Sequence, residues 1–151
     1  MAMMQEIIEK IHLHLHRAKS AVNEIKAWSH IDSGVFEDFE KIKTIDTFIY
    51  RFIKLQDMMG EKLFRIFLDE IGEYRDNMSL LDILDKLEKL EIIENGEEWM
   101  TYRKLRNKLT HEYPSNENEI VEGIKLSIEV FGEIEKILEN IESYKERRKL
   151  I

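Results

Sequence analysis

Leu105-Arg106-Asn107-Lys108-Leu109-Thr110-His111-Glu112-Tyr113-Pro114 closes one amphipathic helix and separates it from the next. Pro114 lacks the N–H that a continuing helix needs and disfavours helical backbone at Tyr113, so the helix must end here. Polar, chemically able side chains crowd one strip of its last turns, about 140° wide at 100° per residue: Arg106, Asn107, Thr110 and His111. Most polar residues elsewhere fall on solvated faces, so we expect the function at this helix end.

Outward from this stretch, apolar residues recur in steps of three and four, which is the spacing of amphipathic helices. Five helices are expected: about Met4–Trp28, Ile42–Ile71, Ser79 to a stop at Asn95-Gly96, Glu97–His111, and Ser115 or Asn116 to the basic C-terminus. No segment has a convincing strand period. The pattern predicts an all-α fold, an antiparallel bundle of four to five helices in a single domain covering 1–151.

Two of the expected helix boundaries depend on specific residues. Ser79 and Asp82 have the spacing of a capping box at a helix start. Gly96, after Asn95, is expected to stop the same helix, since Gly accepts the left-handed conformation that often follows a helix end.

Charge and composition limit the classes of function. The net charge of -8 argues against a protein that binds long duplex nucleic acid by neutralising phosphates. The chain has no Cys, which fits a reducing compartment. Glu6 and Glu9 interrupt the N-terminus, so it does not resemble a signal peptide, and no apolar run approaches the roughly 20 residues that span a bilayer. We expect a cytoplasmic protein with no membrane association.

Other polar residues allow more than one interpretation. Gln56 falls at an apolar position of the second helix, and a buried amide needs partners. A neighbouring helix end would satisfy it, or Gln56 or Asp57 would support the polar helix end. His12 and His16 lie one turn apart and could share a metal, but the other ligands of such a site are missing. We therefore expect a solvated helix flank there, with no metal and no cofactor.

The pairing of Arg106 with His111 has a definite chemical use. A guanidinium is a fixed cation whose planar donors suit a phosphate, and an imidazole moves protons near neutral pH. Together they suffice for metal-free RNA cleavage, in which a ribose 2′-hydroxyl loses its proton and attacks the adjacent phosphorus. Arg103 lies under Arg106 and adds positive charge. The alternative is structural, because the helix dipole alone favours cations at a helix C-terminus.

Arg106-Asn107-x-x-x-His111-x-Tyr113 resembles the Arg-x4-His-x-Tyr motif of the HepT-like toxins in the HEPN superfamily. Members of that superfamily are small all-helical bundles, usually dimeric. Their motif lies near the end of a late helix, before a long final helix, as it does here. The resemblance implies a HEPN-like domain and a metal-independent endoribonuclease. Arg106 and His111 would be catalytic, and Asn107 would assist them.

The resemblance also implies partners. It predicts a homodimeric toxin of a toxin–antitoxin module that cleaves RNA. A cognate nucleotidyltransferase antitoxin would neutralise it by modifying Tyr113 with AMP, because the bulky charged adduct would exclude RNA. Two alternatives stay open: a non-catalytic, substrate-binding accessory subunit of a nucleotidyltransferase, and a helical scaffold without phosphate chemistry.

Overall fold

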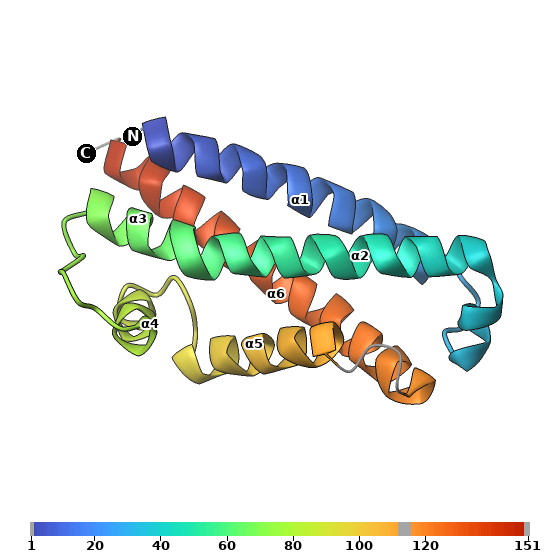
Figure 1. Ribbon diagram of the computed structural model, residues 1–151. Coiled ribbons are helices and arrows are strands. Elements are labelled where there is room, and N and C mark those ends of the chain that lie inside the picture. Colours follow the sequence, from blue (N-terminus) through green and yellow to red (C-terminus); the bar gives the residue numbers. More distant parts are fainter. Residues whose placement is uncertain (1, 112–115, 150–151) are drawn as a thin grey trace.

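The computed structural model describes residues 2–111 and 116–149, and the side chains of 3–110 and 116–148. Over this part of the chain the structure is all-helical, as expected (Figure 1). The α-helices are α1 (Ala2–Lys26), α2 (Phe39–Met58), α3 (Phe64–Glu70), α4 (Leu80–Lys89), α5 (Gly96–His111) and α6 (Glu117–Lys149). A 3-10 turn, η1 (Ser33–Glu37), precedes α2, and a π-helical turn, η2 (Met59–Leu63), joins α2 to α3.

The helices form a bundle around the rod made by α2, η2 and α3 (Figure 1). α1 packs along α2, and α6 passes behind the rod. The ends of α1 and α6 meet, since Lys145 donates a hydrogen bond to Gln5 at 3.3 Å. The ion pair between Lys19 and Glu135, at 2.9 Å, lies further along both helices and shows that they run antiparallel. α4 and α5 lie against the opposite side of the rod, where the polar helix end is located.

The apolar positions expected from the spacing form the core. Nearly all of the predicted apolar stripe of α1 is buried, as is that of α6. The most buried members are Met4, Ile11, Ala18 and Ile25 from α1, and Ile124, Ile134, Leu138 and Ile141 from α6. Burial of this area supplies the main driving force for the fold. None of the described helices is both long enough and apolar enough to cross a membrane.

The second predicted helix contains a feature that the spacing does not reveal. The rod is continuous, but the π turn η2 inserts one extra residue, which moves the buried side of the helix by one position. The spacing therefore predicts Ile66 on the core side, whereas the structure buries Phe64, Phe67 and Leu68 and leaves Ile66 half-buried. Gly60 lies within this turn, where a Cβ atom would be 3.2 Å from the Trp99 ring of α5.

The expected stop at Asn95-Gly96 is wrong. α4 ends at Lys89, and Glu91 adopts the left-handed conformation (φ 61°) that Gly was expected to supply. Asn95 instead caps the start of α5, because its Oδ1 accepts a hydrogen bond from the Glu97 N–H at 2.7 Å. Asn and Gly are common at both ends of helices, so their presence alone does not distinguish a stop from a start.

The other predicted caps are present where the structure describes them. The Ser79 hydroxyl accepts from the Asp82 N–H at 3.1 Å, and the Asp82 carboxylate accepts from the Ser79 N–H at 3.0 Å, which completes the capping box. Asn116 Oδ1 accepts from the Glu119 N–H at 3.2 Å at the start of α6. Ser115, the other residue considered for this cap, lies outside the described residues.

Candidate functional site

The site is built where α5 crosses the C-terminal half of the rod. Trp99 lies against Gly60, Tyr102 contacts Gln56, and Arg106 contacts Asp57. Gly60 contacts the start of α5, whereas Gln56 and Asp57, which precede it on the rod, contact later residues of α5, so the two elements are antiparallel (Figure 1). The last turn of α5 therefore lies beside the part of α2 that precedes Asp57. This arrangement brings side chains from distant parts of the sequence next to the polar helix end.

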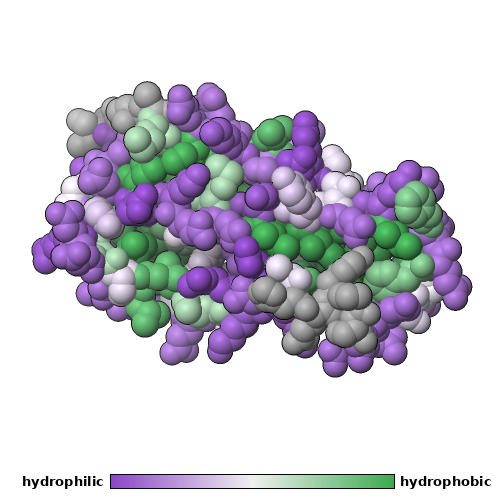
Figure 2. All heavy atoms as spheres, in the orientation of Figure 1, coloured by the Kyte–Doolittle hydropathy of each residue, from purple (hydrophilic) through white to green (hydrophobic). Residues whose placement is uncertain are grey.

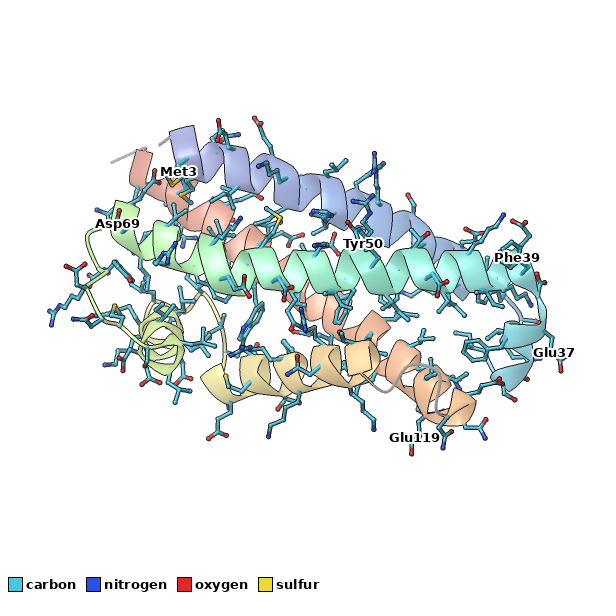
Figure 3. All side chains as sticks on the ribbon, viewed as in Figure 1. Met3, Glu37, Phe39, Tyr50, Asp69 and Glu119 are labelled. Carbon is cyan, nitrogen blue, oxygen red and sulfur yellow. The ribbon has the colours of Figure 1, made fainter. Side chains whose placement is uncertain are left out.

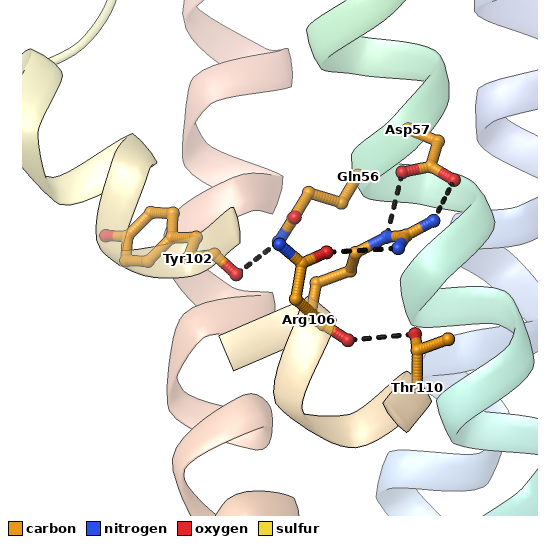
Figure 4. Close-up of polar contacts among 6 residues, drawn as sticks. Gln56, Asp57, Tyr102, Arg106 and Thr110 are labelled. Carbon is orange, nitrogen blue, oxygen red and sulfur yellow. Dashed lines mark hydrogen bonds and ion pairs between the residues drawn. The ribbon is translucent and has the colours of Figure 1, made fainter. Parts of the chain in front are cut away.

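Arg106 is held by two neighbours (Figure 4). Its Nε and Nη2 donate to the two carboxylate oxygens of Asp57, at 3.1 and 2.8 Å, and its Nη1 donates to Asn107 Oδ1 at 3.2 Å. The Arg106 and Asp57 side chains are 24% and 30% exposed. A bidentate pair of this kind fixes both the position and the plane of the guanidinium. The sequence offered Asp57 as a possible support of the polar helix end, and the structure places it as the partner of Arg106.

The pair changes what Arg106 can offer to a ligand. Three hydrogen bonds use three of the five N–H groups of the guanidinium, which leaves two for a phosphate. The carboxylate of Asp57 offsets part of the positive charge. Arg106 therefore acts less as an unpaired cation than as a pre-positioned donor of two hydrogen bonds.

Gln56 is satisfied by α5. It is only 2% exposed, and its Nε2 donates to the Tyr102 carbonyl at 3.1 Å. The sequence predicted that a neighbouring helix end would satisfy Gln56. The partner is instead a carbonyl in the middle of α5. Gln56 therefore fixes α5 at the correct height on the rod, one turn before Arg106. Burial, and then the nearby Glu98, raises the pKa of Tyr102 to about 12, so its phenol stays neutral.

A pocket of about 420 Å³ opens beside Arg106. Polar and apolar side chains line this pocket, including Gln56, Asp57, Trp99, Arg103, Arg106 and Asn107. The Trp99 indole is 1% exposed, and its Nε1–H is a buried donor without a hydrogen-bond partner in the described part of the chain. Arg103, expected to support Arg106, thus lies on the same pocket. It is exposed, whereas Arg106 is half-buried.

The remaining residues of the motif are only partly described. His111 is the last residue of α5, and its backbone lies about 7.5 Å beyond Arg106 along the helix axis. The His111 side chain and all of Tyr113 lie outside the described residues. Thr110 shares the polar strip, but its hydroxyl donates to the Arg106 carbonyl at 2.9 Å within the same helix. The structure thus brings together Asp57, Arg106 and Asn107.

The two histidines considered for a metal lie elsewhere. His12 is within 2.7 Å of the Glu142 carboxylate on α6, and His16 lines a groove between α1 and α2. Among the residues that the structure describes, there is no group of three or more side chains arranged to hold a metal ion.

No protein-family model matches this chain, and no curated protein shows significant similarity to it.

Sequence reasoning also missed two residues beside the site. Tyr50 and Lys54 precede Asp57 by seven and three residues, so all three lie on one face of α2. The signal was this spacing on the second helix. It acquires meaning only once α5 is known to end beside that face.

Proposed function

We propose that the chain is a metal-independent endoribonuclease that cleaves RNA at the C-terminal end of α5. The observation that supports this best is the guanidinium of Arg106, oriented by Asp57 beside a pocket, one and a half turns before His111. A fixed donor of hydrogen bonds to phosphate and an imidazole are then carried by one helix end. These are the two parts that the reaction requires.

The reaction is a transesterification at phosphorus. The His111 imidazole accepts the proton of a ribose 2′-hydroxyl, and the 2′-oxygen forms a bond to the adjacent phosphorus. The bond from phosphorus to the 5′-oxygen breaks, and that oxygen takes up a proton from water, while His111 returns its own proton to the solvent. The products are a 2′,3′-cyclic phosphate and a 5′-hydroxyl. The two free N–H groups of Arg106 stabilise the charge on the phosphoryl oxygens as it develops.

The neighbouring residues position this machinery. Asp57 and Asn107 hold the guanidinium from two directions, and Gln56 fixes the height of α5 on the rod. Arg103 adds a cation on the same pocket. Because α2 and α5 carry these groups on rigid helices, the donors would be in place before RNA arrives, which lowers the cost of reorganisation.

The motif and its place before a long final helix support a more specific proposal. The protein would be a HEPN-like, HepT-like toxin, active as a homodimer in the cytoplasm. A cognate nucleotidyltransferase antitoxin would neutralise it by adding AMP to Tyr113. Co-expression with such an enzyme should add one AMP to the intact mass, and Tyr113→Phe should abolish the addition. An adduct that survives this substitution would exclude Tyr113 as the acceptor.

The nuclease proposal is tested with the purified chain and a labelled single-stranded RNA in EDTA. Wild type should cut the RNA, whereas Arg106→Ala and His111→Ala should each lose at least about 100-fold in rate, the usual contribution of an acid–base or electrostatic group. Lys104→Ala is the matched control, since Lys104 is an exposed cation on α5 that lines a different groove. Equal loss in the control, or intact RNA with wild type, would refute the proposal.

One observation favours a second candidate. Asp57 offsets the charge of Arg106, and the adjacent pocket is large enough for a nucleotide. The chain would then be a non-catalytic accessory subunit that binds a nucleotide for a partner nucleotidyltransferase. This alternative predicts that AMP or another nucleotide quenches Trp99 fluorescence in a Trp28→Phe background, while RNA stays intact.

A further inference from the structure

The exposed face of α2 leads away from the Arg106 site. Asp57, Lys54 and Tyr50 are spaced by three and four residues, so they follow one another along this face over about 10 Å. Figure 3 shows Tyr50 near the middle of α2. Since α5 runs antiparallel to α2 and meets it at Asp57, its last turn points toward the level of Tyr50. The face therefore continues the candidate site.

Two cations lie beside an exposed aromatic ring on this face. Tyr50 is 51% exposed, the Arg51 guanidinium lies 5.1 Å from its ring centroid, and Lys54 Nζ lies 5.6 Å from it. Arg51 also donates to His14 Nδ1 of α1 at 3.0 Å, which connects the two helices. An exposed ring flanked by cations suits a nucleobase stacked between phosphates.

Positive charge accumulates between the two helices although the whole chain carries -8. Burial, and then the charges of Arg51, Lys54 and Arg17, lowers the pKa of His14. Three cations therefore lie close enough to act on His14. Glu24 and Glu40 line the other end of the groove between α1 and α2 and add negative charge there. The basic surface is therefore short, with a length that suits a few nucleotides and not a long duplex.

Figure 2, in the orientation of Figure 1, shows hydrophilic residues over much of the visible surface and a band of hydrophobic residues across its middle. The surface defined by Tyr50, Arg51, Lys54, His14 and Arg17 is polar and cationic, which disfavours a partner helix with an apolar face. Such a surface attracts phosphate groups, and the ring of Tyr50 adds a preference for unpaired bases.

We propose that this surface on α1 and α2 binds the single-stranded RNA that flanks the phosphate to be cleaved, with one base stacked on Tyr50 and adjacent phosphates on Lys54 and Arg17. The proposal rests on the nuclease function in one respect, because that function puts RNA at the end of α5. It explains how an acidic protein can hold RNA: a local cationic strip replaces overall positive charge.

The test measures binding apart from cleavage. The full-length protein is titrated against a fluorescent single-stranded 2′-O-methyl oligonucleotide, which cannot be cut because the attacking hydroxyl is blocked, at several NaCl concentrations. Tyr50→Ala should raise Kd roughly tenfold, while Tyr50→Phe should keep most of the affinity. Lys54→Ala and Arg17→Ala should each reduce the slope of log Kd against log salt by about 0.7. Lys125→Ala, which removes an exposed cation from α6, should leave both quantities unchanged.

Three results would overturn the proposal: no measurable binding, binding that Tyr50→Ala and Lys54→Ala leave unchanged, or competition by polyglutamate as strong as that by the unlabelled oligonucleotide. Light scattering checks the oligomeric state of every variant. A change of state at Tyr50→Ala without a change in Kd would identify a subunit interface and would also refute RNA binding. Cleavage of ordinary RNA is assayed separately. Binding that depends on Tyr50 without any cleavage would refute the nuclease and keep the surface.

Discussion

The pair between Arg106 and Asp57 should be measurable as a coupling free energy. A double-mutant cycle with Arg106→Ala, Asp57→Ala and the double variant isolates the interaction from the effects of each single substitution. The two side chains are 24% and 30% exposed and are joined by hydrogen bonds at 2.8 and 3.1 Å. They lie between exposed ion pairs, worth about 0–1 kcal/mol, and hydrogen bonds to charged groups, worth about 1.5–3 kcal/mol.

We therefore expect a coupling of about 1.5 kcal/mol, which corresponds to about 3–6 °C in Tm for a chain of this size. Urea unfolding followed by circular dichroism gives the four free energies of unfolding. A parallel cycle on Lys86 and Glu73, a single contact at 3.2 Å with 31% and 42% exposure, should give a smaller value. A coupling at Arg106 and Asp57 no larger than in this control would refute the reasoning that Asp57 fixes the guanidinium.

Four further substitutions test the fold. Gly60→Ala should destabilise the protein by about 1–2 kcal/mol and alter Trp99 fluorescence, because the new Cβ meets the ring at 3.2 Å. Gly132→Ala, where a Cβ meets nothing within 4 Å in the middle of α6, should instead stabilise it by about 0.5–1 kcal/mol, and opposite signs in urea unfolding are the check. Ser79→Ala removes the side-chain acceptor of the capping box and should cost about 1 kcal/mol in the same assay, so an unchanged midpoint would contradict the cap. The pKa of His14 is lowered from 6.5 in the folded protein, so as the pH falls His14 is protonated in the unfolded chain before it is protonated in the folded one. The free energy of unfolding should then fall as pH drops below 6.5, and His14→Gln should reduce that fall; an identical pH profile in the variant would contradict the assignment.

The helices were predictable because local spacing encodes them. Stripes such as Ile11, Ala18 and Ile25 alternate with polar residues at the helical period, and the same residues are buried in the structure. The π turn was not predictable in this way, because the spacing of apolar residues continues through it without a break. The contact of Gly60 with Trp99 of α5 was not predictable either, because only the assembled fold brings the two together.

The candidate site shows the same division. Arg106 and Asn107 stand out in the sequence because they are polar, adjacent and close to a helix end. Their partner Asp57 lies 49 residues away, and no local pattern connects it to Arg106. Likewise, Tyr50 reads as an ordinary exposed residue until α5 is placed on α2. Residue types and helix faces can be read from the sequence, but the pairing of one face with another is decided by packing.

The end groups of the RNA fragments test the central proposal most directly. Wild-type protein is incubated with a defined single-stranded RNA in EDTA, and the products are identified by mass spectrometry. We predict fragments with a 2′,3′-cyclic phosphate on one side of the cut and a 5′-hydroxyl on the other, both absent with Arg106→Ala and with His111→Ala. Intact RNA, fragments with a 3′-hydroxyl and a 5′-phosphate, or the same fragments with both variants would contradict it.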